Sequence, residues 1–220
     1  MRWRARSAGA SAVEADVVEA ASAIERSFFA RPTDEVARDL LGCLLCRDGA
    51  GGLTVGRIVE TEAYGGPDDK ASHARAGLTR RTTPMFGQVG HAYVYLIYGM
   101  HECLNVVAHD AHADAGAVLV RALEPVAGVE LMRARRGRQS DPDSKLCSGP
   151  ARLCQAMAVD RSFDGHDLTT VDTLWLARDA DGHGRAEIAS GPRVGVAYAG
   201  AWASRPWRYW LAGNVSVSRR

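Results

Sequence analysis

One stretch of the chain brings a carboxylate, a tyrosine and a histidine close together. Glu62 and Tyr64 belong to a strand-like run, RIVETEAY, and His73 follows in the next segment. A carboxylate held in a partly apolar site can orient and deprotonate water. No Asp or Glu occurs between His73 and His101, where arginines and tyrosines gather instead. A carboxylate beside aromatic rings and an acid-free basic surface is what hydrolysis at a nucleobase taken out of its stack would need.

Arg121 adds to this interpretation because it is the only charged residue in an apolar run, AVLVRAL at 117–123. A buried charge is costly unless it is paired, and a catalytic carboxylate is a suitable partner for a guanidinium. Glu62 is therefore the candidate general base and Arg121 its candidate partner. The alternative is that Glu60 or Glu62 only forms an ion pair with some arginine, without a catalytic role.

The second informative run, HAYVYLIYGM, contains Tyr95 and Tyr98 three positions apart. On a regular strand such residues face opposite ways, so one can line a pocket while the other points outward. An outward ring beside Gly99 resembles the wedges that proteins insert between DNA base steps. The alternative is that the tyrosines reflect only the general preference of aromatic residues for strands.

Composition bounds the class of protein. At 220 residues, with 46% hydrophobic and 24% charged residues, the chain is expected to form one globular domain. The net charge of +1 hides a segregation, because residues 189–220 and 131–140 carry arginines and no acid. These segments predict a surface that faces a polyanion, although solvated surfaces without a partner are the plainer interpretation.

The five cysteines form an odd set that favours a reduced, cytoplasmic protein over a disulfide framework. The CLLC run at 43–46 has the spacing of one half of a zinc site, but no second CxxC and no paired histidines complete the site. The carboxylates near His73 also lack metal-binding spacing, so neither a metal nor another cofactor is expected. The sequence shows no secretory signal and no apolar run long enough to span a bilayer.

The elements expected to position these residues indicate an α+β fold, a single compact domain with a curved, mainly antiparallel sheet flanked by helices. Residues 1–26 are expected to form a flexible tail with a short helix at 13–26, and residues 27–220 the domain. If the second strand is regular, Ile58, Glu60, Glu62 and Tyr64 share one face. We expect helices capped by Thr33, begun by Pro67, and ended by Gly137. Strands are expected at 44–46, 53–64, 91–98, 103–108 and 117–123, and further helices at 128–136 and 148–157.

In these motifs the sequence resembles the alkyladenine (3-methyladenine) DNA glycosylase family, in its mammalian-type branch. The resemblance runs from about residue 27 to near the C-terminus. It rests on RIVETEAY, Gly66-Pro67 with His73, YVYLIYGM, Asn105, RALEP at 121–125, LCSGP at 146–150 and RVGV at 193–196.

The resemblance implies a fold like the C-terminal domain of formyltransferases and a monomeric enzyme acting on double-stranded DNA, cytoplasmic and nucleoid-associated in a bacterium. It implies removal of 3-methyladenine, 7-methylguanine, hypoxanthine and ethenoadenine, with Glu62 activating water and Arg121 holding it. The implied base-binding residues are Tyr64, His73, Tyr95 and Asn105. The implied DNA contacts are Tyr98, Met100, Ser148 and Arg193. His101 stands where some relatives carry an aromatic residue.

Two other functions are compatible with the same residues. One is a protein that binds damaged DNA without catalysis, and the presence of both Glu62 and Arg121 argues against it. The other is a metal-dependent hydrolase of a small nucleoside, which would be sensitive to EDTA.

Overall fold

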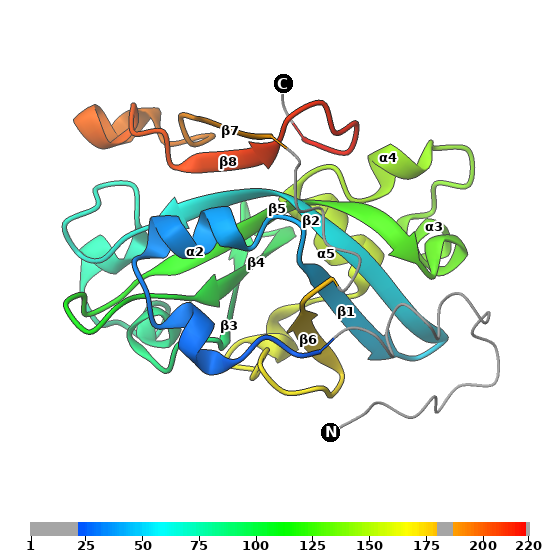
Figure 1. Cartoon of the computed structure of the whole chain (residues 1–220), viewed down its shortest axis with the longest axis horizontal. Helices are drawn as coiled ribbons and strands as arrows, with labels where there is room; N and C mark the ends of the chain where they lie inside the picture. Colours follow the sequence, from blue (N-terminus) through cyan, green and yellow to red (C-terminus); the bar gives the residue numbers. More distant parts are fainter. Residues whose placement is uncertain (1–21, 180–186, 219–220) are drawn as a thin grey trace.

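The computed structural model describes residues 22–179 and 187–218, which form an eight-stranded sheet with short helices around it (Figure 1). The strand order is β3-β4-β5-β2-β1-β6, with β8 paired to β2 and β7 to β8. All of these pairs are antiparallel. The strands are β1 Leu44–Gly49, β2 Gly52–Tyr64, β3 Ala92–Ile97, β4 His101–Val107, β5 Ala117–Ala127, β6 Leu174–Ala177, β7 Ile188–Gly191 and β8 Arg208–Leu211. The predicted α+β class and antiparallel sheet are confirmed.

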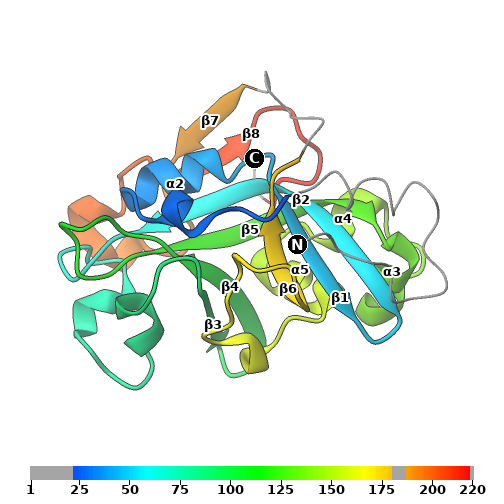
Figure 2. The same cartoon turned by 60° about the horizontal axis from the view of Figure 1, so that its bottom comes forward.

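Four α-helices and five 3₁₀-helices are described. The α-helices are α2 Thr33–Asp39, α3 Val129–Arg136, α4 Asp143–Leu146 and α5 Pro150–Met157. The 3₁₀-helices are η1 Arg26–Phe29, η2 His73–Ala76, η3 Thr83–Phe86, η4 Arg161–Phe163 and η5 Ala197–Trp202. Helices α2 and α5 bury apolar side chains in one main core together with strands β2, β4 and β5. Figure 2 shows α3 and α4 at one end of the sheet, away from η5, while α5 packs against β4 and β5.

The helices expected from Thr33, at 128–136 and at 148–157 are present as α2, α3 and α5, whereas the helix expected from Pro67 is not. Helix α3 ends where Gly137 adopts a left-handed φ of 60°, as predicted. Thr33 does not cap α2, because Pro32 is the N-cap and the Thr33 hydroxyl donates to the Ala108 carbonyl. Pro67 does not begin a helix either: η2 begins only at His73.

Strand β2 is not regular, and this changes which residues share a face. Its pairing with β5 shifts register between Ile58 and Glu60, and again before Thr61. Such bulges bend a strand and reset its alternation, and β2 bends visibly in its middle (Figure 1). Ile58 consequently packs in the main core with Ala63, whereas Glu60 and Glu62 join a separate polar cluster. The prediction that Ile58 shares the glutamate face was wrong.

The packed structure begins before residue 27. Ile24 is fully buried, Ala23 bridges to Ala177 of β6, and Arg26 forms a 2.7 Å ion pair with Asp167. Of the helix expected at 13–26, residues 22–25 are not helical, Arg26 begins η1, and residues 13–21 lie outside the described residues. The stretch 22–26 therefore belongs with the domain rather than with a tail.

All five cysteines are free thiols with buried side chains. In the described part of the chain, no helix has the length and apolar character needed to cross a membrane.

Candidate active site

Arg121 lies at the centre of a buried charge cluster between β2 and β5. Its Nε is 2.9 Å from Glu60 Oε1, and its second nitrogen NH1 is 3.2 Å from Glu62 Oε2. Both carboxylate side chains are 0% exposed. Buried charges of opposite sign stabilise one another only when they are well paired, and this guanidinium bridges the two carboxylates. The predicted pairing of Arg121 is confirmed, with two partners rather than one.

The two glutamates have different surroundings. Glu60 Oε1 also accepts a hydrogen bond from Arg208 at 3.3 Å, and its Oε2 accepts one from the Ser218 backbone N–H at 2.7 Å. It therefore ties β8 and the C-terminal segment to β2. Its partners Arg121, Arg208 and the Ser218 backbone come from three separate segments of the chain, as expected of a structural carboxylate.

Glu62 instead connects to the segment 193–196 and to an aromatic ring. Its Oε1 accepts from the Val194 backbone N–H at 2.6 Å, and its Oε2 accepts from the Tyr64 hydroxyl at 2.7 Å. Burial raises the pKa of Glu62 above its ordinary value, although Arg121 and these donors oppose the shift. Burial and the Glu62 charge raise the pKa of Tyr64 well above 10, so its hydroxyl stays a donor. A carboxyl whose pKa is moved toward neutrality is suited to general base catalysis.

Beside this cluster lies a cavity of about 210 Å³ at the end of the sheet formed by β2, β3 and β4. Four predicted base-binding residues line it together with Tyr98: Tyr64, His73, Tyr95 and Asn105. Glu62 is not in the lining, but the hydroxyl of Tyr64, a lining residue, donates a hydrogen bond to its carboxylate. A larger hollow of about 730 Å³ beside η1 and α2 contains none of the predicted site residues.

His73 is held as a neutral ring in the wall of the cavity. Its Nδ1 is 3.0 Å from the Tyr93 hydroxyl, and its Nε2 is 3.2 Å from a guanidinium nitrogen of Arg81. Because arginine only donates, Nε2 accepts, and Nδ1 carries the proton that is donated to Tyr93. Burial, reinforced by the Arg81 charge, lowers the pKa of His73 to about 4. The His73 and Tyr95 rings meet edge to face at 4.6 Å.

Asn105 is fixed on β4 opposite Tyr93 of β3. Its side chain is buried, and its Nδ2 donates to the Tyr93 carbonyl at 2.9 Å. This bond prevents the amide from swinging away, so the cavity has a rigid polar wall at this point.

Tyr98 and Met100 project from the β3–β4 turn, 84% and 70% exposed. Strand β3 ends at Ile97, so the predicted alternation does not reach Tyr98. Its exposure comes from the turn, where Tyr98 and Gly99 both have positive φ values, 53° and 71°. A positive φ is strained for tyrosine and is common at functional positions. The Tyr98 ring points outward as predicted, but because of the turn and not because of strand alternation.

The two other predicted DNA contacts are less exposed. The Arg193 side chain is buried and pairs with both oxygens of Asp69, at 2.5 and 2.9 Å. This burial contradicts a direct DNA contact by Arg193. Asp69 also accepts from the Gly65 and Ala71 backbone, so the pair fixes the loop that leads to His73. Ser148 is nearly buried and accepts a hydrogen bond from Arg152 at 3.0 Å.

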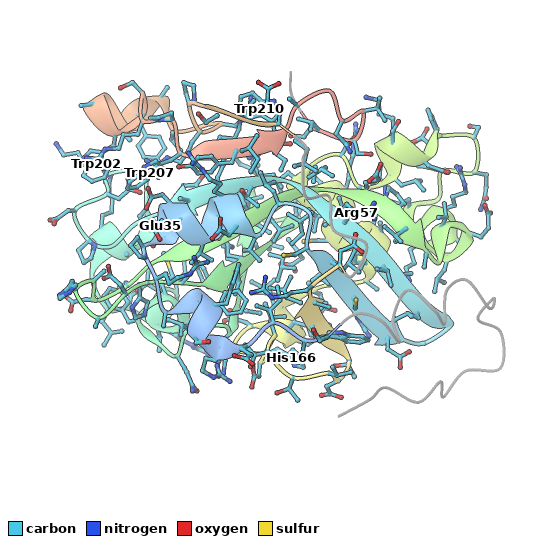
Figure 3. All side chains as sticks on the ribbon, in the orientation of Figure 1. Glu35, Arg57, His166, Trp202, Trp207 and Trp210 are labelled. Carbon is cyan, nitrogen blue, oxygen red and sulfur yellow. The ribbon has the colours of Figure 1, made fainter. Side chains whose placement is uncertain are left out.

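The arginines of the two basic segments, residues 131–140 and 189–220, do not all lie exposed on the surface. Arg208 is buried over the Trp210 ring, and the Arg205 guanidinium lies over the Trp202 and Trp207 rings, at 3.7 and 4.8 Å from their centres. The three tryptophans are labelled in Figure 3. In the segment 131–140, Arg135 donates to the Ala156 carbonyl and Arg133 pairs with Asp143. Several of these arginines hold elements together, so the predicted polyanion-facing surface is narrower than the sequence suggested.

Sequence reasoning did not assign several residues that complete the site. They are Tyr93, Arg81 and Tyr198, which line the cavity, and Val194 and Arg208, which support the glutamates. Tyr93 belongs to the same tyrosine run as Tyr95, and this was a usable signal. The described residues contain no group of three or more His, Cys, Asp or Glu side chains placed to hold a metal.

Comparisons with known proteins agree with this geometry. The model of the methylpurine-DNA glycosylase (MPG) family matches residues 27–215. A putative 3-methyladenine DNA glycosylase of Methanocella arvoryzae is 47% identical over 197 residues, which cover 90% of this chain and 96% of that protein. The DNA-3-methyladenine glycosylase of Homo sapiens is 44% identical over 200 residues, covering 87% of this chain and 66% of the human protein. The mouse enzyme is 45% identical over 201 residues, covering 87% and 60%. This chain belongs to the methylpurine-DNA glycosylase family.

Proposed function

We propose that this enzyme flips alkylated or deaminated purines out of duplex DNA and hydrolyses their N-glycosidic bond with water activated by Glu62. Family membership makes it a monofunctional DNA-3-methyladenine glycosylase of DNA repair. The substrates we propose are 3-methyladenine, 7-methylguanine, hypoxanthine and ethenoadenine. We further propose that it acts as a monomer in the cytoplasm, at the nucleoid if the source is bacterial.

One observation carries the proposal. Glu62 is a buried carboxylate with a raised pKa, paired with Arg121 and hydrogen-bonded to Tyr64, which lines an aromatic cavity. A structural ion pair would not require a neighbouring cavity lined by Tyr64, His73 and Tyr95. A cavity that only bound a base would not require the buried carboxylate.

The proposed reaction uses each group in turn. The flipped base stacks against Tyr64, Tyr95 and the neutral His73 ring. Asn105 crowds the edge of the base and so shapes selectivity. Water reaches the Tyr64 edge of the cavity, gives a proton to Glu62 and bonds through oxygen to C1′ of the sugar. The C1′–N bond breaks and the base leaves with its electron pair, through an oxocarbenium-like transition state that a nearby carboxylate stabilises.

The function is tested with duplexes that each carry one lesion: hypoxanthine, ethenoadenine or 3-methyladenine. We expect release of the free base, unchanged by EDTA, with strand breakage only after alkali. Borohydride added during turnover should trap no protein–DNA adduct, because Schiff-base formation needs an amine. The chain has two lysines, Lys70 and Lys145. Both are exposed and neither lines the cavity, and arginine stays protonated.

Three results would contradict this function. Binding of lesion duplexes without base release would favour a damage-binding protein. Loss of release in EDTA would favour a metal-dependent hydrolase. A trapped adduct that disappeared in Lys70→Ala would replace the water nucleophile by that lysine.

Tyr98 is proposed as the residue that fills the gap left by the flipped nucleotide. Replacing Tyr98 with alanine should weaken binding to a lesion duplex about tenfold, since base stacking on an aromatic side chain contributes roughly 1–3 kcal/mol. Excision from single strands should fall less, because unstacking costs less there. Tyr98→Phe keeps the ring and serves as the control. Equal losses on both substrates would remove the wedge role.

A further inference from the structure

Arg81 introduces a positive charge into a cavity that is otherwise neutral. It comes from the segment between η2 and η3 and is the one arginine, and the one ionised side chain, among the described residues that line the cavity. The same lining contains no Asp or Glu. Glu62, which is hydrogen-bonded to the lining residue Tyr64, is already paired with Arg121. The carboxylate of Asp164 lies with Arg81 in the lining of a neighbouring hollow, outside this cavity.

Two contacts hold this guanidinium on the aromatic wall. One of its nitrogens is 3.2 Å from His73 Nε2, and its central carbon is 5.4 Å from the centre of the Tyr95 ring. Both rings are proposed to stack against the flipped base. A base in the cavity would therefore have the Arg81 charge as a close neighbour.

The proposed substrates differ in charge. A purine alkylated at a ring nitrogen, such as 7-methylguanine, is cationic in its nucleoside, whereas hypoxanthine is neutral. The aromatic faces would attract a cationic base through their π electrons. Arg81 already makes this interaction with Tyr95. A cationic base would also be repelled by the like charge of Arg81, which is exposed to solvent at the cavity wall.

We propose that Arg81 is a specificity-determining residue whose charge disfavours cationic alkylpurines relative to neutral deaminated or ethenoadduct purines. The inference rests on the proposed function, because it concerns which damaged bases that cavity accepts. This proposed role of Arg81 would have a different effect on excision from a contact between Arg81 and a DNA phosphate. A phosphate contact would affect every lesion in the same DNA equally, whereas a charge beside the base changes the ratio between lesions.

The test compares two duplexes of the same sequence, one with 7-methylguanine and one with hypoxanthine. For each, the single-turnover rate constant is divided by the half-saturating enzyme concentration. In Arg81→Gln, the ratio of the 7-methylguanine value to the hypoxanthine value should rise about tenfold, because a like charge is removed from beside the bound base; salt should reduce the effect, since Arg81 is exposed. Arg81→Lys keeps the charge and should leave the ratio close to that of the unsubstituted enzyme.

Arg80→Gln is the matched control, because Arg80 is exposed, as Arg81 is, but does not line the cavity. It should change both lesions by one common factor. The inference is overturned if Arg81→Gln also changes both lesions by one factor, or if Arg80→Gln shifts the ratio as much. If the unsubstituted protein released neither base, the proposed function would fail and this inference with it. Release with an unchanged ratio would overturn this inference alone.

Discussion

Replacing Glu62 with glutamine should stop base release while lesion-duplex binding is retained. The substitution keeps the size of the side chain, and the cavity lining does not include Glu62. It removes the carboxylate that is proposed to accept the proton from water. Loss of a general base typically lowers a rate by a factor of roughly 10² to 10⁴. Single-turnover excision and a binding titration on the same duplex measure the two effects separately.

Glu60→Gln is the comparison that tests the choice of carboxylate. Glu60 accepts from Arg121, Arg208 and the Ser218 backbone, so its loss should lower the unfolding temperature. Chemistry in the folded protein should suffer less than in Glu62→Gln, because Glu60 acts only by holding Arg121. Near-normal excision by Glu62→Gln together with loss in Glu60→Gln would show that the catalytic carboxylate has been misassigned.

Much of the fold could be predicted from the sequence, because strand alternation and glycine stops are local signals. The strand at 53–64 and the stop at Gly137 were predicted in this way. The bulge near Ile58 could not be, since it depends on how β2 pairs with β5. Pro67 fits a helix start by conformation, but the segment after it is held in a loop by the Asp69–Arg193 pair. Asp69 and Arg193 lie far apart in the sequence, so no local pattern indicated this.

In the site, too, local sequence patterns predicted some contacts, whereas contacts between residues far apart in the sequence were not predicted. An arginine in an apolar run predicts a buried carboxylate partner, and Arg121 has two. Arg193 lies in an acid-free segment and was expected at the DNA surface, yet its partner comes from the loop after β2. The charge of a short sequence segment does not show whether its side chains are buried, because burial depends on residues that lie far away in the sequence. Family resemblance named the cavity residues, and the structure shows how Tyr93 and Arg81 hold the His73 ring.

Arg121→Met should have the largest effect on stability. The substitution leaves Glu60 and Glu62 buried without the guanidinium that bridges them. Removing one partner of a buried ion pair typically costs about 3–5 kcal/mol of unfolding free energy. Urea denaturation near neutral pH measures this loss. Arg57→Met is the matched control, because Arg57 pairs with Glu124 and Asp179 nearer the surface, and it should lose less.

The pH dependence of this loss distinguishes charge from packing. Arg121 lowers the pKa of Glu62, so its removal should raise that pKa further above the value in the unfolded chain. A carboxyl with a raised pKa in the folded state favours folding when it is protonated. The stability deficit of Arg121→Met should therefore shrink as the pH falls toward the ordinary carboxyl range, and grow as it rises through the raised pKa. Any remaining base release should require a higher pH than in the unsubstituted enzyme, because Glu62 acts as a base only when ionised. A deficit that stayed constant with pH would mean that Arg121 contributes packing alone, and that it does not keep Glu62 ionised.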